Sequence, residues 1–384
     1  MVKSKNNKIT SAGPSITQAE IDLVAQAIRD GWQDKMSWFI DQFVKEFSEY
    51  VGVKYCLPTA HCTDAIHLAM LVLDVGPGDE VIVPDLTWVA SVAPVLYVGA
   101  KPVFADIDPV SWCITAESIE RCITKSTKAV VVVDLLGNMP EWDEVVELCQ
   151  RENIRIIEDS AEGLGASYRG VQAGNFGEIS LFSFNATKLI MSGQGGAFCT
   201  NDKNIYKKAR LLSHHGIDKE LTGKYYWSNV LGYNYNWTNF QAALALAQLR
   251  RIEELIEYKR WMFREYEKGL GRIEGIQLNS AKENVEPTHW ISVAILDEKY
   301  GLNKEALGEH FSKENIDLRP LFYPVSSMPP FQSYLPQSDM NIINPVTYRL
   351  SKYGVCLPNG NNLSSDDLTR VCKVFQSIIG GGIE

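Results

Sequence analysis

The regular alternation of short apolar runs with helical patterns is the feature that most limits what this chain can fold into. Apolar runs of strand length occupy residues 79–84, 102–106, 129–134, 155–159 and 178–184. Patterns of helical period near 116–123 and 141–152 separate several of these runs. Strands that alternate with helices are typical of a mainly parallel sheet with helices on both faces. We therefore predict an α/β fold.

The length of the chain predicts two domains. With 384 residues, of which 45% are hydrophobic, it can bury a large core. We place a large domain, with an N-terminal helical segment, at residues 1–250 and a smaller α+β domain at 251–384. A long charged helix from 241 to about 268 is predicted between them. In the smaller domain we predict strands at 291–296 and 318–323 and helices at 303–314 and 364–378.

Composition argues against several classes of function. The formal net charge of -10 and the pI of about 5.3 disfavour a general affinity for nucleic acid or anionic membranes. Eight cysteines are scattered without a CxxC pair, which favours reduced thiols over a zinc site or a disulfide framework. No run of about eighteen apolar residues occurs, and no apolar stretch follows the basic N-terminus. We expect a soluble, cytoplasmic protein.

A single lysine stands in the polar turn that follows the apolar run 178–184. The turn reads FSFNATK and ends in Lys188, and the glycine-rich SGQGG follows at 192–196. Backbone packed closely around such a lysine can desolvate the amine and lower its pKa, so that it attacks carbonyl groups. Most lysines are solvated surface charges, so this turn alone is a weak signal.

A second segment supplies carboxylates. The sequence IEDSAE places Asp159 and Glu162 after a short buried strand, where α/β sheets bind ligands. A helix cap would use the same residues and is about as probable without other information. An aldehyde-binding lysine and an aspartate for a pyridinium nitrogen are the two groups that pyridoxal phosphate requires.

Three further segments allow both a structural and a functional interpretation. Thr63 stands where a helix begins and could cap it, or the free N–H groups there could bind a phosphate. Trp88 follows a buried strand and could be core. Asn234 lies in an aromatic, asparagine-rich loop and could be a turn residue. His214 and His215 diverge on a helix, have no third ligand at a suitable spacing, and predict no metal site.

Together these motifs resemble the DegT/DnrJ/EryC1/StrS family of sugar aminotransferases, from Ile9 to about Ile379. The resemblance is carried by FSFNATK with SGQGG, by IEDSAE, by LGYNYNWTNFQAALALAQL and by RPLFYPVSSMPP, in the order of the family. It implies an aspartate-aminotransferase-like fold (fold type I of the pyridoxal-phosphate enzymes), pyridoxal 5′-phosphate as cofactor, and a homodimer with shared active sites.

The resemblance implies roles around the cofactor ring. Lys188 would form the Schiff base and then move the proton as general base and acid. Asp159 would keep the pyridine nitrogen protonated, Glu162 would approach the 3′ oxygen, and Trp88 would stack on the ring.

It also implies how the cofactor phosphate is held. Cys62, Thr63 and Ser183 would bind it, together with Asn234 from the partner subunit. Two positions depart from the family pattern, because Cys62 replaces a usual glycine and Asn236 replaces a usual basic residue.

By the same resemblance the amino donor is L-glutamate and the acceptor a nucleotide-linked keto sugar. The segments LGYNYNWTN and RPLFYPVSSMPP look most like those of enzymes that convert GDP-4-keto-6-deoxymannose to GDP-perosamine. Asp134 and Ser326 stand where histidines are common, in regions expected near the sugar. A UDP- or dTDP-linked sugar, aminated at C3 or C4, is the alternative.

Three rival functions are disfavoured by particular residues. A dehydratase of the same family would carry histidine in place of Lys188. A non-catalytic binding protein would not need Lys188, Asp159 and Trp88 together. A Rossmann dehydrogenase would show GxGxxG after its first strand, which is absent. The usual setting of the family is bacterial surface polysaccharide, O-antigen or lipopolysaccharide synthesis.

Overall fold

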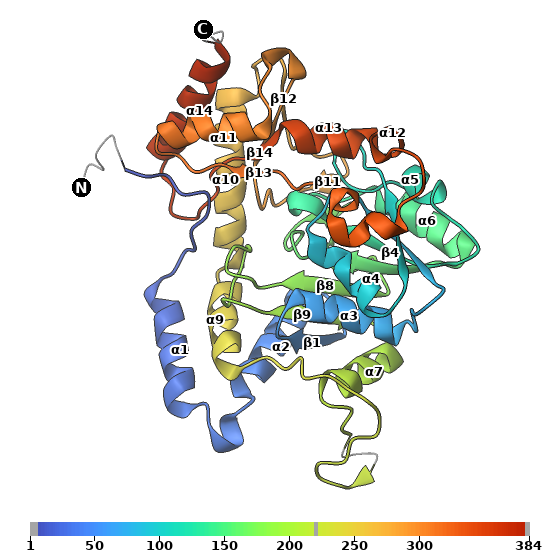
Figure 1. Cartoon of the computed structure of the whole chain (residues 1–384). Helices are drawn as coiled ribbons and strands as arrows, with labels where there is room; N and C mark the ends of the chain where they lie inside the picture. Colours follow the sequence, from blue (N-terminus) through green and yellow to red (C-terminus); the bar gives the residue numbers. More distant parts are fainter. Residues whose placement is uncertain (1–6, 219–221, 381–384) are drawn as a thin grey trace.

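The computed structural model describes residues 7–218 and 222–380 and has a seven-stranded sheet at its centre (Figure 1). The strand order is β1-β9-β8-β5-β4-β2-β3. From β8 to β3 neighbouring strands are parallel, whereas β9 runs antiparallel to both β8 and β1. The strands are β1 Tyr55–Thr59, β2 Glu80–Pro84, β3 Lys101–Ala105, β4 Thr127–Val133, β5 Arg155–Asp159, β8 Ile179–Ser183 and β9 Gly196–Thr200.

Helices cover both faces of this sheet, as predicted. Alternate side chains of β4 enter two separate cores, with Val131 and Val133 in one and Val130 and Val132 in the other. The surrounding helices are α1 Gln18–Asp30, α2 Trp38–Val51, α3 Cys62–Val72, α4 Ala93–Tyr97, α5 Ala116–Glu120, α6 Trp142–Glu152 and α7 Lys203–Ser213.

A second, four-stranded antiparallel sheet lies at the top of Figure 1, in the order β10-β12-β14-β13. A core of its own, which includes Tyr266, Phe311 and Phe375, joins it to α10, α11 and α14. Of the predicted strand 318–323, only Arg319–Pro320 (β13) pairs with a neighbouring strand, so the strand is shorter than expected. The elements are β10 Ile276–Leu278, β12 Val293–Leu296, β13 Arg319–Pro320, β14 Gly354–Cys356, α11 Lys304–Lys313, α12 Met340–Ile343, α13 Pro345–Tyr353 and α14 Ser365–Gly380.

The predicted long helix 241–268 is two helices, so that expectation was wrong. Thr238 caps α9 (Asn239–Leu249), and α10 (Ile252–Leu270) begins after a break at Arg250 and Arg251. Arg251 leaves helical geometry, with φ of -124° and ψ of 25°. The domain division proposed at residue 250 falls in this break. Among the described residues, no helix has the length and apolarity needed to cross a membrane.

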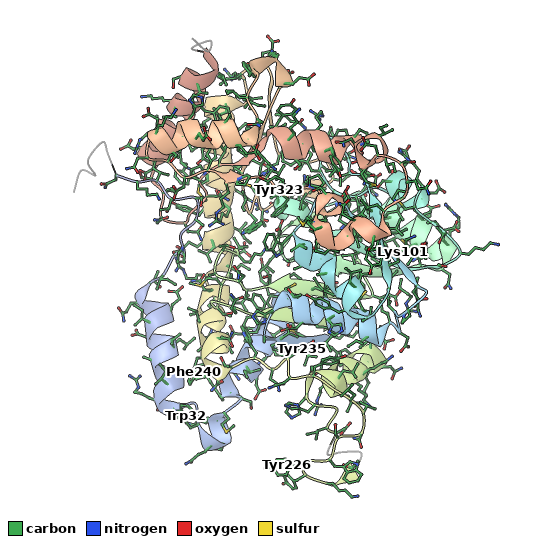
Figure 2. The ribbon with its side chains drawn as sticks, viewed as in Figure 1. Trp32, Lys101, Tyr226, Tyr235, Phe240 and Tyr323 are labelled. Atoms are coloured by element: carbon green, nitrogen blue, oxygen red, sulfur yellow. The ribbon has the colours of Figure 1, made fainter. Side chains whose placement is uncertain are left out.

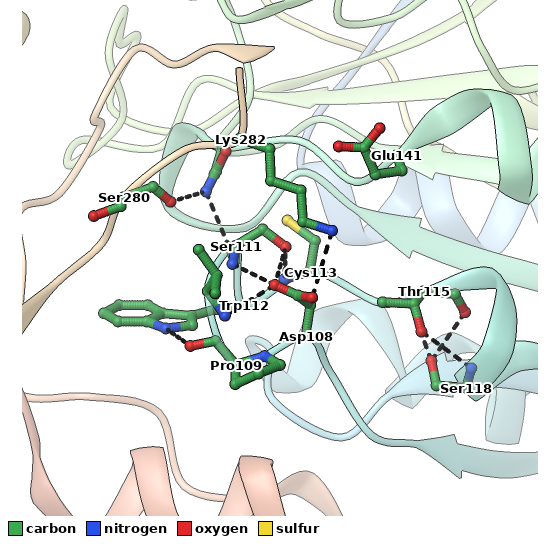
Figure 3. Close-up of polar contacts among 12 residues, drawn as sticks. Asp108, Pro109, Ser111, Trp112, Cys113, Thr115, Ser118, Glu141, Ser280 and Lys282 are labelled. Atoms are coloured by element: carbon green, nitrogen blue, oxygen red, sulfur yellow. Dashed lines mark hydrogen bonds and ion pairs between the residues drawn. The ribbon is translucent and has the colours of Figure 1, made fainter. Parts of the chain in front are cut away.

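A polar loop after β3 links the two sheets (Figure 3). Asp108 accepts hydrogen bonds from the N–H groups of Val110 and Ser111 at 2.9 and 2.7 Å, and Lys282 pairs with it at 3.4 Å. The Asn138 amide donates to the carbonyl groups of Ser111 and Ser280. A small three-stranded sheet adds a second link, in which β11 (Val285–Glu286) pairs with β6 (Ser167–Tyr168), and β6 with β7 (Val171–Gln172).

Candidate active site

A cavity of about 380 Å³ opens where the parallel strands β5 and β8 end and the smaller sheet approaches. Open α/β sheets bind their ligands at this edge, outside the carboxyl ends of the strands. Of the residues predicted to form the site, those that line the cavity are Cys62, Thr63, Trp88, Asp159, Glu162, Ser183 and Lys188. The structure therefore brings together segments that span more than a hundred residues of sequence.

Lys188 is held in a tight loop between β8 and β9. Its N–H donates to the Asn185 carbonyl at 2.9 Å, and that of Ala186 donates to Gly193 at 3.0 Å. The Lys188 Nζ atom lies 3.2 Å from Glu162 Oε1 and 3.8 Å from the ring centroid of Trp290. A nearly buried amine is thus fixed between a carboxylate and an indole face.

Asp159 ends β5 and is 2% exposed. The Ser91 hydroxyl donates to Asp159 Oδ2 at 2.7 Å, and the Ala161 N–H donates to Oδ1 at 3.1 Å. Burial raises the pKa of Asp159, while these two hydrogen bonds and the charge of Lys188 oppose the rise. Burial likewise raises the pKa of Glu162, and Lys188 opposes it.

The helix α3 begins earlier than predicted and points its N-terminus at the cavity. Its N-cap is His61, whose side chain makes no capping hydrogen bond, so the interpretation of Thr63 as the cap was wrong. The first-turn N–H groups of Cys62 and Thr63 thus have no side-chain cap at the cavity wall. Gly196 of β9 packs directly on this turn, because a Cβ atom there would lie 2.5 Å from the Cys62 nitrogen.

Trp88 is not a core residue. It is 59% exposed, lines the cavity, and its ring centroid lies 6.1 Å from that of Phe322. The alternative in which it only fills the interior is therefore contradicted.

Three predicted or suspected residues lie outside the cavity. Asn234 is exposed and accepts a hydrogen bond from Asn236 at 2.8 Å, so within one chain it does not reach the cavity. Asp134 and Ser326 are both fully buried and do not line the cavity, and the expectation that their regions lie near the sugar stays a prediction. Asp134 accepts from the Ser160 hydroxyl at 2.6 Å, and Ser326 donates to Asp85 at 2.8 Å.

Other residues at the cavity escaped the sequence analysis. Ser91 supports Asp159, Trp290 covers Lys188 and donates its indole N–H to the Thr187 carbonyl at 2.9 Å, and Arg319 lines the rim. The sequence offered no signal for Ser91 or Trp290, because each contacts a segment distant in the chain.

The comparisons with known proteins agree with this geometry. Residues 14–376 match the DegT/DnrJ/EryC1/StrS aminotransferase family. The chain belongs to this family. It is 36% identical to a GDP-perosamine synthase of Escherichia coli O157:H7, over 94% of this chain and 95% of that protein. It is 34% identical to a GDP-perosamine synthase of Caulobacter vibrioides, over 97% and 98% of the two chains.

A solved structure agrees as well. The PLP form of the putative sugar aminotransferase Spr1654 of Streptococcus pneumoniae superposes with a TM-score of 0.89 at 25% identity, covering 98% of this chain and all of that one. The fold-type-I prediction is thereby confirmed. As a member of the DegT/DnrJ/EryC1/StrS family, this protein is a pyridoxal-phosphate-dependent sugar aminotransferase.

Proposed function

We propose that this aminotransferase moves the amino group of L-glutamate to C4 of GDP-4-keto-6-deoxymannose and so makes GDP-perosamine. The observation that carries the proposal is one cavity that joins Lys188, Glu162 and Asp159, in a chain similar over its whole length to two GDP-perosamine synthases. Amination of another nucleotide-linked keto sugar, UDP- or dTDP-linked, is the second candidate, because the same three residues would serve it.

The residues in the cavity suit the cofactor. Pyridoxal phosphate supplies the electron sink that lets a proton leave the α-carbon of the donor. In the proposal, Lys188 Nζ takes that proton and returns it, and the carboxylate of Glu162 holds the ammonium between transfers. Asp159 would accept the hydrogen bond of the protonated ring nitrogen, and Trp88 would stack on the ring.

The uncapped N-terminus of α3 supports the proposed phosphate site. Free N–H groups and the positive end of a helix favour an anion. We assign the phosphate to the backbone of Cys62 and Thr63 and the hydroxyl of Ser183. Asn234 of the partner subunit completes this site in the proposal, since within its own chain Asn234 lies away from the cavity.

A homodimer in the cytoplasm, working in surface polysaccharide or O-antigen synthesis, completes the proposal. The chain around Tyr226, which Figure 2 labels, projects from the body of the molecule at the bottom of Figures 1 and 2 and carries exposed apolar side chains. Tyr226 is 94% exposed and Leu231 is 86% exposed. Such a patch is typical of an interaction surface.

The test is a spectral half-reaction. The protein is loaded with pyridoxal phosphate, L-glutamate is added, and the visible absorption band of the cofactor is followed as it converts to the pyridoxamine form. We expect full conversion in the wild type, none in Lys188→Ala, and normal conversion in Lys203→Ala, which removes an exposed lysine of α7.

The acceptor is then identified by adding nucleotide keto sugars to the pyridoxamine form. Return of the visible band with GDP-4-keto-6-deoxymannose, and not with UDP- or dTDP-linked sugars, supports the proposal. A return only with another nucleotide would replace the acceptor, and failure of the wild type with every amino donor would reject the proposed donor reaction.

A further inference from the structure

A second hollow adjoins the active-site cavity and is not used by the roles assigned above. It is a groove of about 370 Å³ between one face of α11 and the segment 318–323. Arg319 and Pro320 line both the groove and the cavity, so the two hollows meet at β13. The other residues of the groove are Lys304, Glu305, Gly308, Glu309, Ser312, Leu318 and Tyr323.

The chain from Arg319 to Tyr323 forms the wall between the two hollows. Phe322 lines the cavity, where its ring lies near Trp88, while the next residue, Tyr323, lines the groove. A ligand that passes Arg319 can therefore have one end in the cavity and the other on Tyr323.

Arg319 is the cation available at this junction. In residues 7–218 and 222–380 its guanidinium makes no ion pair, and the residue is exposed. The two lysines that line these hollows each have a partner within the chain. Lys188 pairs with Glu162, and Lys304 donates to the Leu321 carbonyl at 3.0 Å. A guanidinium presents a planar fork of donors that matches phosphate oxygens.

The far end of the groove combines a flat ring with carboxylates. Lys304 Nζ lies 3.4 Å from the centroid of Tyr323, and the ring, which is 48% exposed, is labelled in Figure 2. The Tyr323 hydroxyl donates to Glu305 at 3.0 Å. Glu309 lies one helical turn further on α11 and is exposed. An aromatic ring stacks on a nucleobase, and a carboxylate accepts hydrogen bonds from its N–H groups.

The carboxylates of the groove favour one kind of base. Guanine presents a ring N–H and an exocyclic amino group side by side, so one carboxylate can accept both hydrogen bonds. Uracil and thymine present a single ring N–H between two carbonyl oxygens, which a carboxylate repels. An acidic groove next to a free arginine thus fits guanine behind a diphosphate.

We propose that Arg319 binds the diphosphate of the sugar nucleotide and that the groove on α11 binds its guanine base, with Tyr323 as the stacking ring and Glu309 as the acceptor. This inference rests on the proposed function, because it takes the acceptor to be a nucleotide-linked sugar. To the proposed function it adds the residues that select which nucleotide the sugar carries.

The first test measures GDP binding to the cofactor-loaded enzyme by calorimetry, without any amino donor. We expect the wild type to bind GDP at least tenfold more tightly than UDP. Arg319→Gln should weaken GDP binding at least tenfold, and Glu309→Gln should reduce the preference for GDP over UDP. The matched control is Arg272→Gln, which removes an exposed arginine outside both hollows and should change neither affinity.

Gly308 allows the groove to be filled without disturbing the fold. It lies on α11, and a Cβ atom there would meet no heavy atom within 4 Å. Gly308→Leu should therefore fold and bind GDP at least tenfold more weakly than the wild type, while Gly308→Ala should bind almost normally. Equal affinities of all variants for GDP, or equal affinity of the wild type for GDP and UDP, would overturn the inference.

The donor half-reaction separates this inference from the proposed function. Arg319→Gln and Gly308→Leu should convert the cofactor with L-glutamate at the wild-type rate and with the wild-type dependence on glutamate concentration. If Arg319→Gln weakens glutamate instead of GDP, the arginine serves the donor carboxylate and the inference is wrong. If the wild type does not react with glutamate at all, it is the proposed function that fails, whatever the affinity for GDP.

Discussion

Ser91 is the residue on which the charge state of Asp159 depends most directly. Its hydroxyl donates to Asp159 Oδ2 at 2.7 Å, in a site where burial raises the pKa of the carboxyl group. A hydrogen bond donated to a carboxylate stabilises its ionised form and so opposes the rise that burial causes. Ser91→Ala should therefore raise the pKa of Asp159 further. Because the ionised form is the active one in the proposal, the acidic limb of the rate profile should move to higher pH.

The measurement is the rate of the glutamate half-reaction as a function of pH. Thr87→Ala is the control, since within residues 7–218 and 222–380 the Thr87 hydroxyl is hydrogen-bonded to the Ser91 hydroxyl, at 3.0 Å, and removing it leaves the donor to Asp159 in place. An acidic limb that stays where it is in Ser91→Ala would show that Ser91 does not support the charge of Asp159.

At the scale of single residues, the sequence predicted the groups that the proposed chemistry requires but not the residues that position those groups. Lys188 and Asp159 were identifiable because each ends a recognisable strand and turn. Ser91 and Trp290 were not, because their contacts join segments 68 and 102 residues away from Asp159 and Lys188. The contact of Asp134 with Ser160 was not predicted either, since it joins the ends of two strands that are 26 residues apart.

Among the secondary-structure elements, the contact between β9 and α3 shapes the proposed phosphate site. Gly196 pairs with Ser183 and Thr59, and it lies so close to the first turn of α3 that a Cβ atom would come within 2.5 Å of the Cys62 nitrogen. Gly196→Ala must therefore displace the turn. We expect at least tenfold weaker binding of pyridoxal phosphate, measured by fluorescence or absorbance titration, and a lower melting temperature.

The matched glycine is Gly170, in the turn between β6 and β7. It has φ of +78° and open space around its Cβ position, so Gly170→Ala costs only backbone strain of about 1 kcal/mol. It should leave cofactor affinity unchanged. If Gly196→Ala binds the cofactor as tightly as the wild type, the close packing of β9 on α3 does not shape the site.

A buried carboxylate connects α1 with α9 and α10 and makes stability depend on pH. Glu20 is 1% exposed and accepts hydrogen bonds from the Thr17 N–H, from Gln248 at 2.6 Å and from Arg251 at 2.9 Å. Burial raises its pKa, but the hydrogen bonds from Thr17 and Arg251 outweigh burial and lower the pKa from 4.5 to about 2.

A folded-state pKa below the unfolded value means that the stabilisation is present above pH 4.5 and is lost as the pH falls toward 2. The wild type should lose up to about 3 kcal/mol of unfolding free energy over this range through Glu20 alone. Denaturant titrations at several pH values should show that Glu20→Gln lacks this component. Glu254→Gln removes the exposed carboxylate on the same arginine and should change stability by less than about 1 kcal/mol. Equal pH dependence in wild type and Glu20→Gln would contradict the assignment.

Two features that the sequence analysis did not predict, the strand β9 and the break between α9 and α10, have a common cause. Gly196–Thr200 reads GAFCT, which has little β-branched character, and it forms β9 because it pairs with a strand on each side. The break between α9 and α10 has no proline or glycine to announce it. It follows from tertiary contacts, since Arg251 turns toward Glu20 and Ser15. Local propensity predicted the elements whose stability is local, whereas these two depend on partners distant in sequence.

For the whole molecule, the position of Asn234 is the observation that bears on assembly. Asn234 is exposed and lies outside the cavity of its own chain, where its backbone bridges to His214, and exposed apolar side chains such as Leu231 precede it in the sequence. If two copies share their active sites as proposed, each site takes Lys188 from one protomer and Asn234 from the other. A mixed dimer, with one protomer that lacks Lys188 and one that lacks Asn234, then contains one intact site.

We therefore expect Lys188→Ala and Asn234→Ala, each nearly inactive alone, to regain activity when they are co-expressed with different tags and purified as a mixture. Random pairing makes about half of the dimers mixed, each with one intact site of two, so about a quarter of the wild-type activity should return. Lys188→Ala mixed with Asp159→Ala is the control, because both lesions lie in the same protomer's cavity wall and an exchange of subunits repairs neither site. Activity that stays at the level of the separate variants, in a sample shown by sedimentation to be dimeric, would mean that each chain builds its phosphate site alone.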